Sequence, residues 1–211
     1  MRAPATSLAA LPGAQSLLAQ ARSIILRPRE TWPEIAKEDS TTASLLTGYI
    51  APLAAIGPVA GLIGSTLLGV RLPFGGSYRV PFGSALVSAV MQYALAIGAV
   101  FAMAWIIDAL APRFGGERSR SQALKVATYA CTPSWLLGIL GLVPLLSFLG
   151  LFGLYSGYLV YLGLPVVMRS PEERALGYTA AVIGCAIALF MVAGTIAARF
   201  IAYPSLFLPV R

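Results

Sequence analysis

Five apolar stretches, each long enough to cross a bilayer, dominate this sequence of 211 residues. A helix needs about 20 predominantly apolar residues to cross the hydrocarbon core. Charged residues make up only 11% of the chain, whereas a typical globular protein has about 25%. We therefore predict an all-α polytopic membrane protein, a bundle of about five transmembrane helices. The predicted spans are residues 47–70, 84–110, 123–142, 148–168 and 176–202.

The spans divide the chain into three predicted parts. Residues 1–43 form a cytoplasmic N-terminal segment with an amphipathic helix, residues 44–203 form the five-helix domain, and residues 204–211 form a short external tail. Only residues 143–147 separate the third span from the fourth. One bent re-entrant unit is an open alternative there. Two spans in a tight hairpin is the favoured interpretation, because their combined length far exceeds one crossing.

The distribution of basic residues predicts how the chain is oriented. Of the 15 Lys and Arg residues, eleven lie on the side of the N-terminus, counting Lys125 just inside the third span, and four lie on the opposite side. Cytoplasmic loops of membrane proteins are enriched in such residues. We therefore expect a multipass protein of the inner (cytoplasmic) membrane, with its N-terminus cytoplasmic and its C-terminus external. The net charge of +7 then reflects orientation, and we expect no nucleic-acid partner.

The composition removes several classes of catalytic and metal site. The sequence has no His, which excludes imidazole metal sites and His-based catalytic triads. Its two cysteines, Cys131 and Cys185, lie in separate apolar runs without the spacing of a redox or zinc motif. No activated nucleophile, carboxylate pair or phosphate-binding glycine loop is recognisable. We expect no enzyme, no metal and no cofactor.

The segment before the first span has the pattern of an amphipathic helix. A second short helix is expected from about Glu30, with Trp32 and Ile35 facing the bilayer. Two placements stay open: an interfacial helix lying on the inner leaflet, or a helix packed on the cytoplasmic end of the bundle. The residues predicted to share the apolar face of the first helix are Leu17, Leu18, Ala21, Ile24 and Ile25.

Small residues and prolines mark how the spans pack. Small residues four apart let helix backbones approach closely in lipid, which favours a compact bundle or a homo-oligomer. Prolines inside spans predict kinks, and kinked helices also line the binding sites of transporters. The small pairs are Gly57 with Gly61, Gly153 with Gly157, and Ala180 with Gly184, and the prolines are Pro52, Pro58, Pro133 and Pro165.

Polar side chains on the third and fourth spans form the candidate site. Polar groups at membrane depth should face protein or a wet cavity. They therefore predict either a polar pocket open to the cytoplasm or hydrogen bonds between helices. We expect a tyrosine of the fourth span to contact segment 128–135 inside the bundle. The candidates are Lys125, Thr128, Thr132 and Trp135 on one face of the third span, Tyr129 at its edge, and Tyr155, Tyr158 and Tyr161 on the fourth.

Asp108 is the one acidic residue placed within a predicted span. It lies near the cytoplasmic end of the second span, where the negative end of the helix dipole disfavours an anion. It should therefore seek a cation, and Lys125 is the cation at a matching depth. We predict an ion pair between Asp108 and Lys125.

Several short motifs occur in a fixed order between about Arg27 and Arg199. They are Pro28-x3-Trp32-x2-Ile35-x2-Glu38, Pro112-x-Phe114-Gly115-Gly116, Tyr129-Ala130-x-Thr132-Pro133-x-Trp135, and Tyr155-Ser156-x-Tyr158-Leu159-x-Tyr161-x-Gly163-Leu164 followed by Met168 and Pro171. In order and spacing they resemble bacterial members of the Ypt-interacting-protein (Yip) family. The resemblance implies a five-helix membrane domain with a cytoplasmic N-terminus and, for bacterial members, no settled activity. Eukaryotic relatives are linked to vesicle traffic and Rab-type GTPases, a partner that we do not carry over to this chain.

Two functions are compatible with these features. The favoured one is a non-enzymatic membrane protein that organises or shapes the bilayer, or scaffolds membrane partners; membrane lipids, further copies of itself and other membrane proteins are its expected partners. The alternative is a small transporter or channel for an ion, metabolite or lipid. A cavity lined by Thr128, Thr132 and Tyr158 would favour transport, and a tightly packed bundle would favour the scaffold.

The charge distribution predicts the sidedness of two loops. A cysteine placed near Gly116 should react with an impermeant thiol reagent only from the cytoplasm, and one near Ser77 only from outside. Labelling on inverted and right-side-out membrane vesicles measures this. If both positions react from the same side, the five-span topology is wrong.

Overall fold

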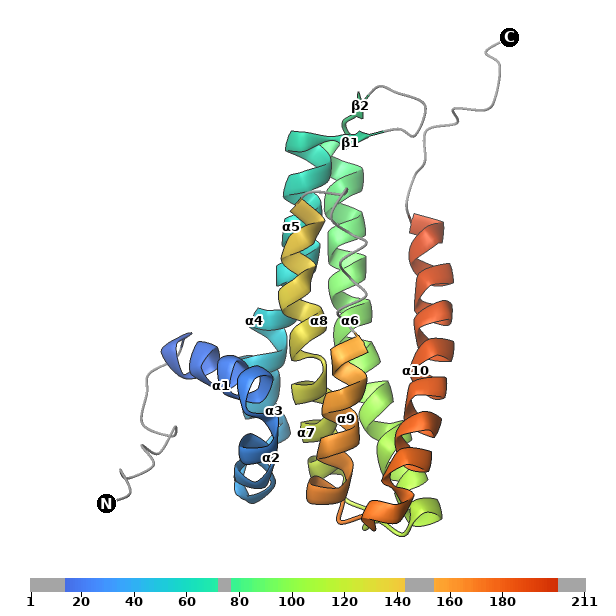
Figure 1. Cartoon of the computed structure of the whole chain (residues 1–211). Coiled ribbons are helices and arrows are strands. Elements are labelled where there is room, and N and C mark those ends of the chain that lie inside the picture. Colours follow the sequence, from blue (N-terminus) through green and yellow to red (C-terminus); the bar gives the residue numbers. More distant parts are fainter. Residues whose placement is uncertain (1–13, 72–76, 143–153, 201–211) are drawn as a thin grey trace.

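The computed structural model describes residues 14–71, 77–142 and 154–200 as a tall bundle of helices (Figure 1). The predicted fold class, an all-α polytopic membrane protein, is confirmed. The described residues add one minimal hairpin at the end of the bundle opposite the N-terminal helices. In it, β1 (Val70–Arg71) pairs antiparallel with β2 (Ser77–Tyr78).

Three stretches of helix are long and apolar enough to cross a membrane. They coincide with the first, second and fifth predicted spans, because length and uniform apolarity are properties of the local sequence. The first contains α3 (Thr42–Leu45), the π-helical η2 (Leu46–Ile50), α4 (Ala51–Ala54), α5 (Ile56–Ile63) and the π-helical η3 (Gly64–Leu68); the second joins α6 (Phe82–Leu110) to η4 (Ala111–Phe114); the third is α10 (Glu172–Phe200).

The third and fourth predicted spans are built from shorter elements. The third consists of α7 (Arg120–Ala130), α8 (Thr132–Leu137) and the 3-10 helix η5 (Gly138–Leu142). The fourth contains α9 (Leu154–Val167), and its predicted start lies outside the described residues. The connection at 143–147 also lies outside them. The count of five spans therefore stays a prediction.

The helix breaks coincide with three of the four prolines predicted to kink the spans. A new helix begins within two residues before Pro52, Pro58 and Pro133. Proline has no N–H to donate to the preceding turn, so the first turn of a helix is where its ring is tolerated. Pro165, by contrast, lies inside the uninterrupted α9.

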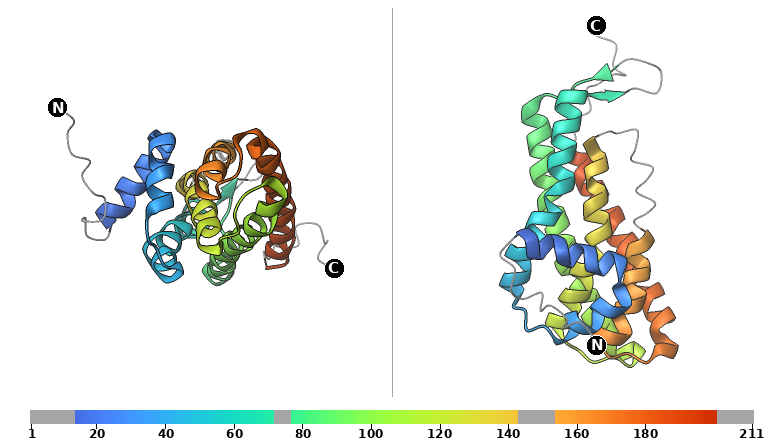
Figure 2. Two further views of the ribbon diagram at one scale, coloured as in Figure 1. Left: turned by 90° about the horizontal axis from the view of Figure 1, so that it is seen from below. Right: turned by 60° about the vertical axis from the view of Figure 1, so that its left-hand side comes forward.

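The two N-terminal helices lie against the bundle. Helix α1 (Ala14–Leu26) crosses it at a steep angle to the long helices, and α2 (Pro28–Lys37) turns from its end along the bundle (Figures 1 and 2). The expectation that Trp32 and Ile35 face the bilayer is wrong, because both are buried in the protein core. Of the two open placements, α2 therefore takes the one packed on the bundle.

Helix α1 combines a buried face with an exposed one. Ala21 and Ile24 are buried, as the predicted apolar face requires. The assignment of Leu18 to that face is wrong, because Leu18, like Leu26, is exposed, at 62% and 64% respectively. Arg22 lies on the exposed side, between these two leucines. A stripe made of residues 18, 22 and 26 therefore points away from the protein.

Helix α7 occupies the centre of the bundle. Every residue from Ala123 to Ala130 is buried, Lys125 included, although the helix is one of the less apolar ones. Helices α2, α3, α6 and α9 pack around it. Because residues 123–130 of α7 are enclosed, a polar side chain among them is costly unless it finds a partner within the protein.

One of the small residues predicted to aid packing, Gly57, makes a close backbone approach, although its partner Gly138 was not predicted. A Cβ added at Gly138 of η5 would lie 2.8 Å from the Cα of Gly57 in α5. The two backbones are therefore in contact, as expected for small residues between membrane helices. Gly61 and Gly184 have open space at the same position, and Gly153 lies outside the described residues.

Candidate functional site

The N-terminal helices meet the bundle through a fully buried tryptophan. Trp32 of α2 places its ring edge-on to Tyr129 of α7, with ring centroids 6.4 Å apart. Its other side lies against α9 at Gly163, where an added Cβ would be 2.8 to 3.0 Å from three atoms of the indole ring. The absence of a side chain at Gly163 thus creates a notch in α9, and the indole ring fills it. Any larger residue at this position would close the notch.

Lys125 caps the end of α2. Its Nζ donates a hydrogen bond to the carbonyl oxygen of Ile35, at 3.0 Å, and a second, short one to the carbonyl oxygen of Glu38. The last carbonyl groups of a helix have no partner within the helix and carry partial negative charge. The buried ammonium is hydrogen-bonded there to two carbonyl groups, and the nearby carboxylates of Glu38 and Asp39 attract it at longer range.

Tyr129 joins α7 to α1 and to the first span. Its hydroxyl oxygen accepts a hydrogen bond from Nε2 of Gln20, at 2.8 Å. Its ring lies 4.7 Å from the ring of Tyr49 in η2. Thr132, at the start of α8, shares a buried hydrogen bond of 2.8 Å with the Tyr49 hydroxyl. We call the six residues Gln20, Trp32, Tyr49, Lys125, Tyr129 and Thr132 the docking cluster.

Three members of the docking cluster were not among the predicted site residues: Gln20, Trp32 and Tyr49. Tyr49 carried a usable signal, since a tyrosine at membrane depth needs a polar partner.

Tyr178 of α10 carried the same signal. Its hydroxyl donates to the carbonyl oxygen of Ile107, and its ring stacks on Phe114 at 5.0 Å. Neither signal identifies the partner, because each partner comes from a distant part of the chain.

The three tyrosines of α9 do not form the predicted pocket. The Tyr155 hydroxyl donates to the carbonyl oxygen of Ile25 in α1, at 2.8 Å. Tyr158 and Tyr161 are 41% and 39% exposed on the outside of the bundle. Within the described residues, none of the three hydroxyls bonds to segment 128–135.

Ser134 and Ser156 provide the polar contact between α8 and α9, with their hydroxyl oxygens 3.0 Å apart. Trp135 is half-buried at the edge of the core. The candidate residues of the third and fourth spans thus do not form one site. Lys125, Tyr129 and Thr132 belong to the docking cluster, and Tyr158 and Tyr161 are exposed.

The predicted ion pair between Asp108 and Lys125 is not formed. The Lys125 ammonium donates its hydrogen bonds to carbonyl groups at the end of α2. Asp108 is buried, and its Oδ1 has no hydrogen-bond partner within the described residues. The prediction matched Asp108 to the cation at a similar depth, but that cation bonds to two backbone carbonyl groups.

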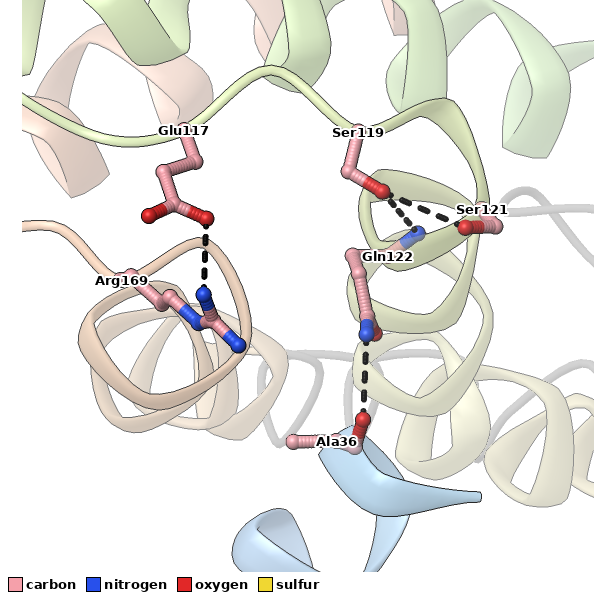
Figure 3. Close-up of polar contacts among 6 residues, drawn as sticks. All are labelled: Ala36, Glu117, Ser119, Ser121, Gln122 and Arg169. Carbon is pink, nitrogen blue, oxygen red and sulfur yellow. Dashed lines mark hydrogen bonds and ion pairs between the residues drawn. The ribbon is translucent and has the colours of Figure 1, made fainter. Parts of the chain in front are cut away.

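A second set of polar contacts lies at the base of the bundle (Figure 3). Gln122 of α7 donates from Nε2 to the carbonyl oxygen of Ala36, at 3.0 Å, close to the Lys125 contact. Ser119 caps the start of α7 by accepting from the Gln122 backbone N–H. Arg169 pairs with Glu117 at 3.1 Å. This last pair is exposed, so it contributes about 1 kcal/mol or less.

The arrangement is a joint between helices. Thr128, Tyr129, Thr132 and Lys125 are all almost fully buried, and three of them bond to α1, α2 or η2. The Thr128 hydroxyl has no partner within the described part of the chain. That part also contains no group of three or more His, Cys, Asp or Glu residues able to hold a metal ion.

Replacing Gly163 tests the notch. Gly163→Ala should lower the stability of the purified protein by about 1–3 kcal/mol, because the new methyl group overlaps the Trp32 ring. Thermal unfolding in detergent measures this. Gly184→Ala is the matched control, since its methyl group meets open space, and it should unfold at or above the wild-type temperature. Equal stability of the two variants would show that Trp32 does not occupy the notch.

Replacing Lys125 tests the cap on α2. Lys125→Met removes the charge at similar size, and with it the two hydrogen bonds from the ammonium to the carbonyl groups of Ile35 and Glu38. We expect a loss of about 1.5–3 kcal/mol, the range for hydrogen bonds to a charged group. Lys37→Met, at an exposed position of α2, should change stability by no more than about 0.5 kcal/mol. If the two variants unfold at the same temperature, the ammonium does not hold α2.

Comparison with known proteins gives a consistent result. A family model described as the Yip1 domain matches residues 22–193. The inner membrane protein YohC of Escherichia coli K12 is 26% identical over 157 residues, which cover 72% of this chain and 80% of YohC. YohC of Escherichia coli O6:H1 strain CFT073 matches with the same values. No solved structure matches. The chain therefore belongs to the Yip1 domain family.

Proposed function

We propose that this chain is a non-enzymatic membrane protein that organises the bilayer by holding α1 in the cytoplasmic leaflet. The observation that carries the proposal is that α1 is fixed across the bundle while one of its faces stays exposed. Gln20 bonds to Tyr129 and the Ile25 carbonyl oxygen accepts from Tyr155, whereas Leu18 and Leu26 face away from the protein. A helix fixed in this way presents apolar side chains beside the bundle.

The orientation of the chain supports the choice of leaflet. Basic residues are concentrated at the end of the bundle where α2, the start of α7 and the start of α10 lie. Cationic loops favour the cytoplasm, so α1 lies on the cytoplasmic side. YohC is named as an inner membrane protein, and we extend that location to this chain.

The shape of the molecule supports an effect on curvature. Seen along the bundle, α1 projects outside the group of long helices (Figure 2, left). A helix with an apolar face buried in the headgroup region binds in the plane of one leaflet. By occupying area in the cytoplasmic leaflet only, α1 bends the bilayer toward the cytoplasm. Membrane lipids are then the direct partner.

The closed docking cluster argues against transport. Thr128 and Thr132 are shut off from solvent inside the bundle, while Tyr158 lies on its outer surface. These three residues therefore cannot line one wet cavity. The amide, hydroxyl and ammonium groups of the cluster bond to one another or to backbone carbonyl groups, and within the described residues the buried indole N–H of Trp32 has no hydrogen-bond partner. No activated nucleophile or acid–base pair is recognisable among them.

Vesicle reconstitution tests the proposal. Protein in vesicles of phosphatidylethanolamine and phosphatidylglycerol is captured through an N-terminal affinity tag, so that only vesicles with the N-terminus outward are imaged. Wild-type protein should give a smaller mean diameter by cryo-electron microscopy than protein-free vesicles. Leu18→Asn with Leu26→Asn should restore the protein-free diameter, because α1 loses its two exposed leucines.

Leu18→Met with Leu26→Met is the matched control. It keeps apolar side chains at both exposed positions and should reduce the mean vesicle diameter as the wild type does. The two double variants should unfold at similar temperatures in detergent, since both positions are exposed. An equal mean vesicle diameter for the wild type and the Asn variant would contradict the proposal.

A further inference from the structure

We infer that the cytoplasmic lipid–water boundary crosses the bundle at the level of Trp105, Tyr158 and Tyr161, whose exposed rings contact the lipid headgroups. The docking cluster then lies at and below this boundary, and the base of the bundle extends into the cytoplasm. The inference concerns the depth of the protein and does not depend on whether α1 bends the bilayer.

The bundle is longer than a bilayer is thick. The stretch from Phe82 to Phe114 has 33 residues and is about 50 Å long at 1.5 Å per residue. The hydrocarbon core is only about 30 Å thick. Roughly 20 Å of this helix must therefore lie outside the hydrocarbon.

The excess length lies at the cytoplasmic end of α6. At the other end, the apolar side chains of Phe82, Val87 and Val90 are exposed from the first turns onward, so that end belongs in lipid. Trp105 follows Phe82 by 23 positions and is 66% exposed. That separation is about 35 Å along the helix, which matches one hydrocarbon core with a modest tilt. Tryptophan is enriched at the membrane interface.

Two contacts place the tyrosines of α9 at the level of Trp105. The Tyr178 hydroxyl bonds to the Ile107 carbonyl oxygen, which aligns this part of α10 with the end of α6. Ile183 lies about 7.5 Å farther along α10. It contacts α9 at Gly157, where an added Cβ would be 3.2 Å from its Cδ1. Gly157 is therefore level with about residue 102 of α6.

Tyr158 and Tyr161 follow Gly157 within about one turn toward the cytoplasmic end. They therefore bracket the level of Trp105, on a different side of the bundle. Both rings are exposed, and within the described residues neither hydroxyl has a hydrogen-bond partner. A phenol ring with an apolar body and an unpaired hydroxyl is suited to the headgroup region, where ester and phosphate oxygens accept hydrogen bonds.

Helix α1 reaches the same level. Tyr155, less than one turn above Tyr158, bonds to the Ile25 carbonyl oxygen of α1. Gln20 of α1 bonds to Tyr129, which sets Tyr129 at the boundary. Lys125 is one turn nearer the cytoplasm, about 6 Å away. This depth is compatible with a buried ammonium near the carboxylates of Glu38 and Asp39, because the group lies in the cytoplasmic extension and outside the hydrocarbon.

Depth measurement by electron paramagnetic resonance tests the inference. Spin labels are attached to the full chain in liposomes at Trp105→Cys, Tyr158→Cys or Tyr161→Cys, in a Cys131→Ala, Cys185→Ala background. Ile187→Cys and Arg118→Cys serve as references for the hydrocarbon and for water. Collision rates with oxygen and with a water-soluble nickel chelate report the depth of each label.

The three test labels should share one depth, within about 5 Å, between the two references. Labels at 158 and 161 that behave like the one at 187, or like the one at 118, would overturn the inference. A second measurement avoids the cysteine-free background. Lipids brominated near the headgroup should quench the fluorescence difference between wild type and Trp105→Phe more strongly than lipids brominated near the chain end, and the reverse order would also overturn it.

Discussion

Lys125 places its ammonium group against the last carbonyl oxygens of α2, those of Ile35 and Glu38. The two carbonyl oxygens also accept from the backbone N–H groups of Glu38 and Ser40. The ammonium itself is the group that needs this site, because a buried charge without hydrogen-bond partners is costly. This contact fixes where α2 ends, and it thereby seats Trp32 in the notch at Gly163. With α2 in place, α1 is carried across the bundle to meet Tyr129 and Tyr155.

The docking cluster therefore makes the N-terminal helices part of the membrane domain. Buried polar contacts hold helices in one arrangement, because an alternative packing leaves donors and acceptors unpaired. For a protein proposed to organise lipid, rigidity matters more than a cavity. Helix α1 can displace lipid only if the bundle holds it at a constant depth, and the level of Trp105, Tyr158 and Tyr161 is where we place that depth. Membership in the Yip1 domain family fits this picture without specifying a substrate.

The sequence predicts the parts of the structure that depend on local composition. The runs at 47–70, 84–110 and 176–202 identify the long helices, since apolarity over about 20 residues is visible without the fold. The site was predicted in part: Lys125, Tyr129 and Thr132 do meet other helices. Their partners could not be predicted, because the partners of Lys125 are backbone carbonyl groups, which every residue has. Trp32 was placed toward lipid because nothing local shows that Gly163, far along the chain, leaves room for it.

Hydrogen–deuterium exchange of α2 in lipid nanodiscs tests the central claim most directly, that the N-terminal helices are an integral part of the bundle. The account predicts that the backbone amides of Trp32 and of residues 34–37, which lie past the first turn of α2, exchange as slowly as those of the central helix α7. A docked helix opens only when its buried contacts break. Exchange of α2 at the rate of an unstructured peptide, while α7 stays protected, would contradict the account.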